Sequence, residues 1–307
     1  MKILLTGGSS FTGMWFAKAL AAAGHEVVCP LKRSAYEGLR RERVEQLEGC
    51  VRVVPGCPYG GEEFLQLVRG EEGWDAFCHH AAEVHGYKEF LFDVPHALYN
   101  NTGQLPVVLQ ALEGKGCGQV ILTGSYFEPR EGVGSEEVRA VSPYGLSKAF
   151  TAEMFAFYCQ HYGLSLKKFV IPNPFGPFEG EERFTAFLAR SWLEEKPVIV
   201  SHGEYVRDNI HVGLLAQAYW KFVEGEERVC RPSGYPEPQG VFVRRFAEEM
   251  QRRWQLPCEF EVPKQTDFSE PRVRINSDFL DPVALNWSET EAWDQLADYY
   301  QTKVACP

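Results

Sequence analysis

MKILLTGGSSFTG, residues 1–13, decides the fold of this 307-residue chain. The apolar run at its start predicts a buried strand, and the small residues after the glycine turn predict a helix over residues 12–23. A strand, a glycine turn and a helix in this order form a cradle for a dinucleotide phosphate, because glycines let the backbone approach the pyrophosphate and the helix N-terminus faces the anion. Such turns are common, so the function depends on motifs further along.

Predicted strands and helices alternate through the first half of the chain. Strands are expected at residues 2–6, 25–29, 51–54, 76–78 and 119–122, and helices at 12–23, 62–69, about 96–112 and from 142 onward. This alternation favours parallel strands joined by right-handed crossovers. The expected fold is therefore α/β, a Rossmann-type doubly wound parallel sheet.

After Val170 the pattern is less regular. Prolines interrupt the chain, and further helices are expected near residues 184–194, 242–254 and 289–300. We expect an NAD(P)-binding domain over residues 1–171, with 203–225 returning to it. Residues 172–202 and 226–307 would then form a smaller α/β substrate-binding lobe.

Charge and composition restrict the class of partner. The formal net charge is -11, from 31 Lys and Arg against 42 Asp and Glu, which disfavours a nucleic-acid surface. No apolar run reaches the roughly 20 residues that a membrane helix needs, and no leader precedes the first strand, so a cytoplasmic protein is expected. Nine scattered cysteines without a C-x-x-C pair favour reduced thiols and no metal site, despite the pair His79-His80.

A second motif, Tyr144 to Lys148, adds chemistry to the glycine turn. Ser142 is a good N-cap and Pro143 suits the first turn, so Tyr144 is expected at the start of a helix. Tyr144 and Lys148 would share one helix face, about 6 Å apart. A phenol beside an ammonium can transfer a proton at an oxygen-bearing carbon, and Ser125 is expected at the carboxyl edge of the sheet, where such folds bind ligands. The alternative is a surface pair on an amphipathic helix.

Together these motifs resemble the extended short-chain dehydrogenase/reductases, the superfamily of NAD(P)-dependent nucleotide-sugar epimerases, dehydratases and reductases. The resemblance covers nearly the whole chain: the glycine turn, His79–Ala82, Asn100–Gly103, Ser125, Tyr144 with Lys148, Asn173–Pro177, Arg207–Val212 and Leu285–Trp287. It implies that Tyr144 is the acid/base, that Ser125 binds the substrate oxygen and that Lys148 holds the nicotinamide ribose. It also implies that Asn100 kinks its helix.

The resemblance implies a wider set of site residues. The cofactor would contact Gly7, Ser9, Ser10, Phe11, Thr12, Gly13, Lys32, Arg33, Ala81, Ala82, Asn100, Thr123, Tyr144, Lys148 and Pro172. The substrate would contact Glu83, Ser125, Tyr126, Asn173, Arg207 and Arg272. His79 and His80 are assigned no chemical role. A homodimer is expected through the helices of Asn100 and Tyr144, with Phe150, Met154 and Phe157 packing in the core or on the dimer face.

Two departures from the family pattern concern the cofactor. Ser10 stands where the middle glycine is usual, and we expect the turn to tolerate it. After the second strand, NAD enzymes place an acidic residue for the ribose 2′-hydroxyl, whereas this chain has Leu31, Lys32 and Arg33. Two cations would attract a 2′-phosphate, which favours NADP(H) over NAD(H). The alternative is a solvated basic turn.

The cofactor and the tyrosine both indicate the direction of the reaction. NADPH enzymes usually reduce, and a phenol with a pKa near ~10 is already protonated at neutral pH, as a reductase needs. Glu128 follows Ser125 one position too late for the acid of a 4,6-dehydratase. We therefore expect an NADPH-dependent reductase of a keto group on a nucleotide-activated deoxy sugar. The alternatives are a nucleotide-sugar 4-epimerase and, in another class, a non-catalytic NADP-sensing protein.

Arg207 is the main indication of a nucleotide-sugar substrate. In such enzymes the arginine of this segment grips the diphosphate, for which a planar bidentate donor is suited. The alternative role is a structural ion pair with Asp208 or a neighbour. The second arginine usual before the C-terminal strand is missing in register, because residues 266–270 occupy that stretch. Candidates to replace it are Lys264, Arg272 and Arg274.

Overall fold

The computed structural model describes residues 1–134 and 139–305 of the chain. The chain divides into two compact units. The first comprises Met1–Glu131, Val138–Ile171 and Tyr219–Arg231, and the second comprises Gly132–Glu137, Pro172–Ala218 and Pro232–Pro307. Tyr219–Arg231 overlaps the segment 203–225 that was expected to return to the first domain.

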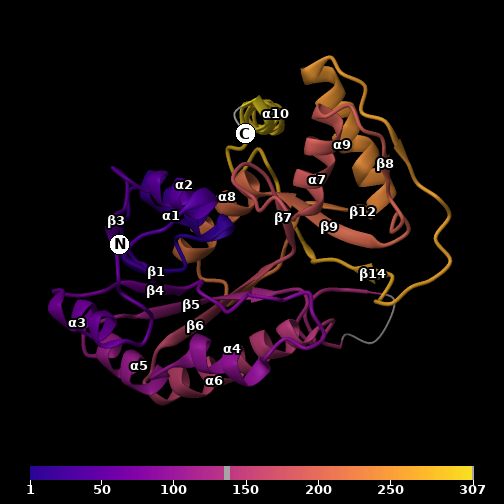
Figure 1. Cartoon of the computed structure of the whole chain (residues 1–307). Coiled ribbons are helices and arrows are strands. Elements are labelled where there is room, and N and C mark those ends of the chain that lie inside the picture. Colours follow the sequence, from indigo (N-terminus) through magenta and orange to yellow (C-terminus); the bar gives the residue numbers. More distant parts are fainter. Residues whose placement is uncertain (135–138, 306–307) are drawn as a thin grey trace. The chain divides into compact units, whose positions relative to one another are not determined.

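A parallel sheet forms the centre of the first unit (Figure 1). Its strands are β1 Lys2–Thr6, β2 Glu26–Pro30, β3 Arg52–Val54, β4 Ala76–His79, β5 Gln119–Ser125, β6 Ser165–Ile171 and β10 Val229–Cys230. They lie in the order β10-β6-β5-β4-β1-β2-β3, and each neighbouring pair is parallel. The chain runs outward in one direction from β1 and in the other from β4. This strand order is that of a doubly wound parallel sheet, so the predicted fold class is confirmed. Such folds bind their ligands at the point where the direction changes.

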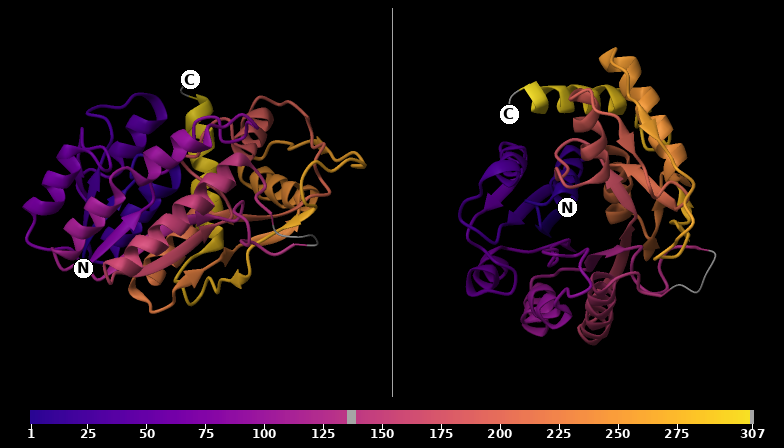
Figure 2. Two further views of the ribbon diagram at one scale, coloured as in Figure 1. Left: turned by 90° about the horizontal axis from the view of Figure 1, so that it is seen from below. Right: turned by 45° about the vertical axis from the view of Figure 1, so that its right-hand side comes forward.

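Helices cover both faces of this sheet. They are α1 Phe11–Ala22, α2 Gly38–Glu45, α3 Glu62–Gly70, α4 Val94–Thr102, α5 Leu105–Glu113, α6 Pro143–His161 and the end of α8 Val212–Glu224. Figures 1 and 2 show α3, α4, α5 and α6 on one face and α1 and α2 on the other. Apolar side chains of α3, α5 and α6 pack on β1, β4 and β5 in one buried cluster, and burial of that apolar surface holds the layers together.

The prediction of one helix over residues 96–112 is wrong, because α4 ends at Thr102 and α5 begins at Leu105. Gln104 has a left-handed backbone with φ 53°. Pro106 explains the break: it lacks the N–H that would bond to the Thr102 carbonyl, and its ring would clash with that carbonyl in a continuous helix. The interruption therefore lies beyond Asn100, which stays within α4.

The second unit has its own small sheet and core. Its longer elements are β7 Asn173–Phe175, α7 Phe184–Leu193, β9 Val206–His211, β12 Tyr235–Pro238, α9 Gln239–Trp254, β14 Val273–Arg274 and α10 Glu289–Ala305. Two short pairs complete it: β8 Val198–Ile199 with β13 Phe260–Glu261, and β11 Pro232–Ser233 with β15 Asp278–Phe279. Strand β9 lies between β12 and β14 and also pairs with β7. The three helices predicted near residues 184, 242 and 289 are confirmed.

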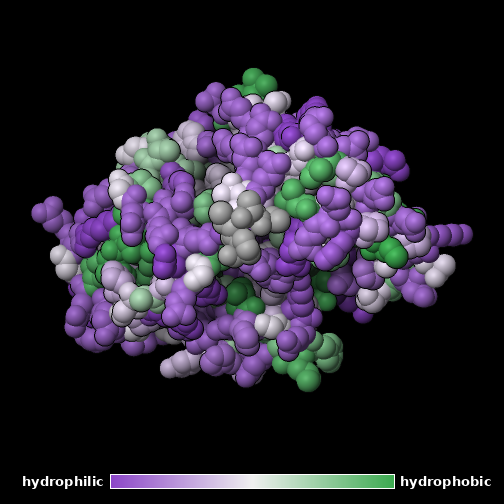
Figure 3. Space-filling view, turned by 45° about the horizontal axis from the view of Figure 1, so that its top comes forward, coloured by the Kyte–Doolittle hydropathy of each residue, from purple (hydrophilic) through white to green (hydrophobic). Residues whose placement is uncertain are grey.

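The surface is mostly polar in the view of Figure 3, where hydrophobic residues form scattered patches. This agrees with the net charge of -11. Within the described residues, no helix is both long enough and apolar enough to cross a lipid bilayer.

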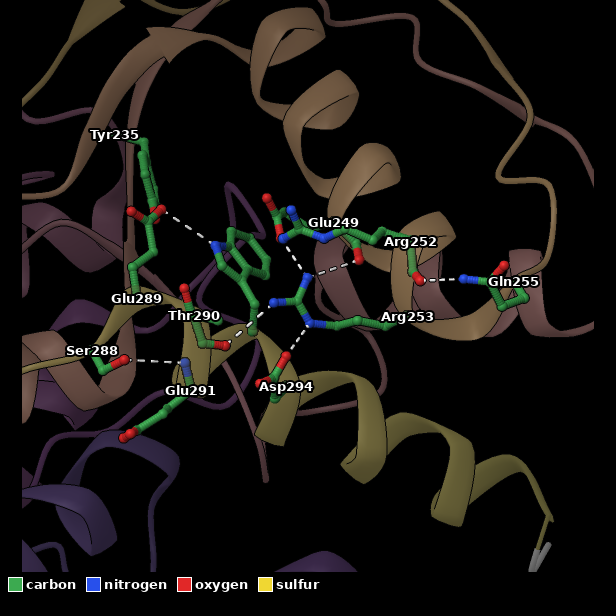
Figure 4. Close-up of polar contacts among 11 residues, drawn as sticks. Tyr235, Glu249, Arg252, Arg253, Gln255, Ser288, Glu289, Thr290, Glu291 and Asp294 are labelled. Atoms are coloured by element: carbon green, nitrogen blue, oxygen red, sulfur yellow. Dashed lines mark hydrogen bonds and ion pairs between the residues drawn. The ribbon is translucent and has the colours of Figure 1, made fainter.

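Arg253 joins α9 to α10 in the second unit (Figure 4). Its Nε donates to Asp294 Oδ1 at 2.6 Å, its Nη2 to the Thr290 carbonyl at 3.3 Å, and its Nη1 to Glu249 on its own helix. The side chain is only 11% exposed, whereas that of Arg252, which pairs with the same Glu249, is 64% exposed. Arg253 thus connects the two helices through hydrogen bonds that are largely shielded from solvent, whereas the exposed Arg252 pairs with its own helix.

Replacement of Arg253 by alanine should destabilise the second unit by about 1–2 kcal/mol, because two acceptors on α10 lose a charged donor. Urea unfolding followed by tryptophan fluorescence measures this, since Trp254 and Trp293 are buried in the second unit. The matched control Arg252→Ala should change the midpoint little, as expected for an exposed ion pair. Equal losses in the two variants would contradict the assignment.

Candidate active site

The glycine turn after β1 has the geometry of a phosphate cradle. Gly7 has φ +83°, and a Cβ there would lie 2.9 Å from the Ala81 backbone nitrogen. Helix α1 begins at Phe11 and has no acidic residue in its first turn. A helix N-terminus without a carboxylate favours an anion. These residues therefore fit a dinucleotide bound through its phosphates at the switch point of the sheet.

Ser10 is accommodated because its side chain is used within the turn. Its Oγ accepts from Gly13 N at 3.1 Å as the N-cap of α1, and lies 3.1 Å from His80 Nε2. The same His80 nitrogen is 2.9 Å from Thr12 Oγ1, and its Nδ1 is 3.1 Å from Thr123 Oγ1. His80 therefore ties the glycine turn to β5. The sequence analysis assigned His80 no chemical role. Its structural role could have been inferred from the polar residues Ser10, Thr12 and Thr123, which lie in the turn, in α1 and in β5.

Both histidines at the end of β4, His79 and His80, are neutral at physiological pH. Burial, followed by the charge of Lys148, lowers the pKa of His79 and of His80 to about 3. His79 Nε2 lies 3.1 Å from the Asn101 carbonyl, and Asn101 Oδ1 accepts from Glu83 N at 2.8 Å. The asparagine buried at the end of α4 is thus Asn101. Asn100 is only partly buried and donates to Glu83 Oε2 at 2.8 Å; its contact with a cofactor stays a prediction.

Ser125 is the last residue of β5 and lies at the carboxyl edge of the sheet. Its Oγ accepts from Phe127 N at 3.2 Å, and its own N–H donates to Glu128 Oε1 at 2.7 Å. The other oxygen of Glu128 accepts from Lys168 Nζ at 2.6 Å. Glu128 and Lys168 were not predicted as site residues, because they are 40 residues apart in sequence and meet only through the pairing of β5 with β6.

Tyr144 and Lys148 project from the first turns of α6. Ser142 caps this helix by accepting from Gly145 N at 3.2 Å, as predicted. A Cβ at Gly145 would lie 2.2 Å from the Phe127 carbonyl oxygen. The first turn of α6 therefore packs directly on the turn that follows Ser125, so the three predicted catalytic residues belong to one region of the first unit.

The environment of Tyr144 is aromatic and its phenol stays protonated. The rings of Tyr87 and Phe92 meet the Tyr144 ring edge to face, at 5.7 and 5.9 Å between centroids. Burial, and then the charges of Glu128 and Tyr87, raise the pKa of Tyr144 well above its usual value. A phenol in this setting is a proton donor at neutral pH.

Lys148 is almost completely buried and titrates close to neutrality. Burial lowers its pKa to about 8, which Glu128 opposes and Lys168 reinforces. Lys148 therefore loses its proton before Tyr144 does as the pH rises. At neutral pH the site therefore holds a charged lysine and a protonated phenol, the state from which Tyr144 can donate a proton.

The remaining predicted residues of the first unit lie around the same edge. Lys32 and Arg33 are exposed directly after β2 and Leu31. Ala81 N donates to Thr6 Oγ1 at 3.2 Å, at the end of β1. Tyr126 is buried and its N–H donates to the Ile171 carbonyl at 3.1 Å.

In the second unit, Arg207 is held by several acceptors. Its Nη1 lies 3.0–3.2 Å from the carbonyls of residues 206, 271 and 272, and its Nη2 donates to Glu270 Oε2 at 3.0 Å. The ion pair is thus with Glu270. Asp208 instead accepts from Gly234 N at 2.8 Å and Asn276 N at 3.0 Å. The contact of Arg207 with a diphosphate stays a prediction.

Two more predicted substrate residues, Asn173 and Arg272, also lie in the second unit. Arg272 is exposed and pairs with Glu204 at 2.7 Å. Asn173 begins β7 and donates to Asn209 Oδ1 at 2.6 Å, and Pro172 precedes it. Among the described residues, no three His, Cys, Asp or Glu side chains are grouped to hold a metal ion, and the eight described cysteines are free thiols.

Comparisons with known proteins show what this chain is similar to. A curated relative, the dTDP-glucose 4,6-dehydratase of Mycobacterium tuberculosis (strain H37Rv: ATCC 25618), is 28% identical over 222 residues. The match covers 69% of this chain and 65% of the dehydratase, slightly less than two thirds of that enzyme.

Solved structures of similar fold cover almost the whole chain. The UDP-glucose 4-epimerase of Thermotoga maritima, solved with UDP-glucose, is 21% identical, with a TM-score of 0.74 over 99% of this chain and 100% of that one. The UDP-glucuronic acid 4-epimerase of Bacillus cereus, solved with UDP-glucuronic acid and NAD, is 18% identical, with a TM-score of 0.75 over the same shares. A dTDP-glucose 4,6-dehydratase of Streptomyces venezuelae with NAD bound has a TM-score of 0.70 at 18% identity, over 99% and 98% of the two chains.

The family model described as "NAD dependent epimerase/dehydratase family" matches residues 3–232, which contain the glycine turn, Ser125, Tyr144 and Lys148. This confirms the resemblance inferred from the motifs. The chain belongs to the NAD dependent epimerase/dehydratase family, within the extended short-chain dehydrogenase/reductases.

Proposed function

We propose that this protein reduces a keto group on a nucleotide-activated deoxy sugar, with NADPH as the reductant. The observation that carries the proposal is the start of α6: Tyr144, whose pKa burial raises, precedes Gly145, which packs on the turn that begins at Ser125. The bound cofactor would supply a hydride to the ketone carbon. Tyr144 gives its proton to the ketone oxygen, and the Ser125 hydroxyl orients that oxygen. Ketone, hydride and proton together make the alcohol.

Lys148 would hold the nicotinamide ribose from the same helix. Its position one turn after Tyr144 places both on the α6 face that packs against the sheet edge. Because its pKa is about 8, it carries its charge at neutral pH and donates to ribose oxygens there. Donation of the proton turns Tyr144 into a tyrosinate, which the charge of Lys148 would stabilise until a proton from solvent restores the phenol.

The choice of NADPH depends on the end of β2. Leu31 stands where a carboxylate would bind a ribose 2′-hydroxyl, and Lys32 and Arg33 are exposed beside it. A 2′-phosphate carries a negative charge that two adjacent cations attract. NAD(H) is the alternative cofactor, because two of the three solved structures described above contain NAD.

A 4-epimerase is the second candidate, because solved 4-epimerases share this fold over nearly the whole chain. That reaction needs Tyr144 to remove a proton as well as to donate one. Removal requires the phenolate form of Tyr144, and the raised pKa makes this form scarce at neutral pH. A 4,6-dehydratase ranks lower, although a curated relative is one. The nearest acid after Ser125 is Glu128, which already pairs with Lys168.

We also propose a homodimer through α4 and α6. Tyr99 on α4 and Phe157 on α6 are large apolar side chains, 76% and 66% exposed, and Phe150 on α6 is 46% exposed. Met154 packs instead against the core of the first unit. Exposed aromatic residues on two helices in contact are typical of a surface covered by a second copy.

Replacement of Tyr144 by phenylalanine should lower turnover of keto-sugar nucleotides about 10²- to 10⁴-fold, because the proton donor is lost. Cofactor binding, followed by calorimetry, should persist. The control Tyr158→Phe, on the same helix, should keep full activity. Full turnover by Tyr144→Phe would exclude the proposed mechanism, whereas cofactor binding without turnover of any substrate by the wild type would favour the sensing alternative.

Replacement of both Lys32 and Arg33 by alanine should weaken NADPH binding about 10- to 100-fold and leave NADH binding nearly unchanged. Titration calorimetry of both nucleotides with the wild type and the double variant measures this. The matched control removes Arg40 and Arg41, two arginines of α2, and should have a smaller effect. Tighter binding of NADH by the wild type would contradict the choice of NADPH.

A further inference from the structure

A largely buried group of four charges lies behind Ser125. Glu128 and Glu131 both accept from Lys168 Nζ, at 2.6 and 2.9 Å, and Glu131 also accepts from Arg231 Nε at 2.7 Å. The side chains of Glu128 and Glu131 are 1% and 8% exposed. Each of the two carboxylates is paired with a cation, which is the condition for keeping such groups in a protein interior.

The backbone of β5 is shaped around this group. A Cβ at Gly124 would lie 2.6 Å from Lys168 Cε and 3.0 Å from Glu128 Oε1. The missing side chain of Gly124 therefore makes room for the ion pair directly before Ser125. Parallel pairing with β6 brings Lys168 to this edge, opposite Leu122.

Glu128 has two connections to the site. Through Oε1 it accepts from the Ser125 N–H at 2.7 Å, and its own N–H donates to the Ser125 carbonyl at 3.0 Å. The turn between them carries the Phe127 carbonyl, on which Gly145 of α6 packs. The carboxylate thus closes the Ser125 turn, and that turn contacts the helix that carries Tyr144 and Lys148.

We propose that Glu128 is a positioning residue of the active site: its carboxylate, held by Lys168, fixes the Ser125 turn and keeps a negative charge beside Tyr144 and Lys148. This inference rests on the proposed function, which makes Ser125, Tyr144 and Lys148 catalytic. The contacts of Glu128 themselves do not depend on which substrate binds. Glu128 acts through Ser125 and through its charge, and does not exchange a proton with the substrate.

The charges around Lys148 determine how removal of Glu128 changes the pKa of Lys148. Glu128 raises the pKa of Lys148 against the larger lowering by burial, and Lys168 lowers it. Tyr144 lies on the same helix and is protonated, and Tyr87 packs on its ring. His79 and His80, at the end of β4, have pKa values of about 3 and carry no charge near neutrality. Loss of Glu128 therefore removes the carboxylate that raises the Lys148 pKa, and leaves Lys168, still paired with Glu131, to lower it.

The test is an NMR titration of ¹³Cε-labelled lysine in the cofactor-free protein, with the Lys148 signal assigned from its absence in Lys148→Met. The Lys148 midpoint should fall from about pH 8 to about pH 7 in Glu128→Gln, because its favourable charge partner is gone. The carbonyl oxygen of the new side-chain amide can still accept from Ser125 N, so the turn should stay closed.

Two further variants separate charge from structure. Glu131→Gln removes a carboxylate from the same Lys168 without touching Ser125, and should leave the Lys148 midpoint near pH 8. Glu128→Gln combined with Lys168→Gln removes both opposed charges, so the midpoint should return towards that of the wild type; this variant also serves if the single one does not fold. An unchanged midpoint in folded Glu128→Gln, or equal shifts in Glu131→Gln, would overturn the proposal.

Turnover supplies the second readout. Glu128→Ala, which loses the acceptor for Ser125 N as well as the charge, should lower kcat about tenfold or more with little change in KM, and Glu128→Gln should retain more of kcat. Wild-type protein that binds cofactor but reduces no keto-sugar nucleotide would refute the proposed function. The NMR titration would still decide the role of Glu128.

Discussion

Parallel pairing of β1, β4, β5 and β6 is the constraint on which the site depends. Because the four strands run in one direction, their carboxyl ends meet at one edge of the sheet. Three of them deliver a component there: Gly7 and Ser10 follow β1, His79 and His80 lie at the end of β4, and Ser125 ends β5. Short polar contacts, such as those of His80 to Ser10 and Thr123, join these ends to one another.

Burial of charge is the second organising feature, and it acts on Tyr144 and Lys148 together. In water a phenol and an ammonium both titrate near pH ~10, but here burial brings the pKa of Lys148 down to about 8 and pushes that of Tyr144 up. The charge of Glu128 raises the pKa of Tyr144 further and limits the fall in the pKa of Lys148. A site that keeps its phenol protonated and its lysine charged at neutral pH is suited to giving a proton to a reduced carbonyl oxygen.

The sequence predicted the helix starts whose capping and turn residues lie within a few positions of one another. Ser142 and Pro143 located the start of α6, and the glycine turn located α1, because caps and turns depend on residues a few positions apart. The break between α4 and α5 was missed, although Pro106 at the start of α5 signals it. The ion pair of Glu128 with Lys168 was beyond prediction, because it depends on the register of two strands far apart in sequence.

The central claim is net reduction by a hydride from a dissociable nicotinamide cofactor, and isotope transfer tests it most directly. The protein would be incubated with NADPH deuterated at C4 of the nicotinamide and with a nucleotide-activated keto-deoxy sugar, and the product analysed by mass spectrometry and ¹H NMR. The account predicts one deuterium at the new carbinol carbon for each NADPH oxidised. A product that gains no deuterium, or a sugar epimerised without consumption of NADPH, would contradict it.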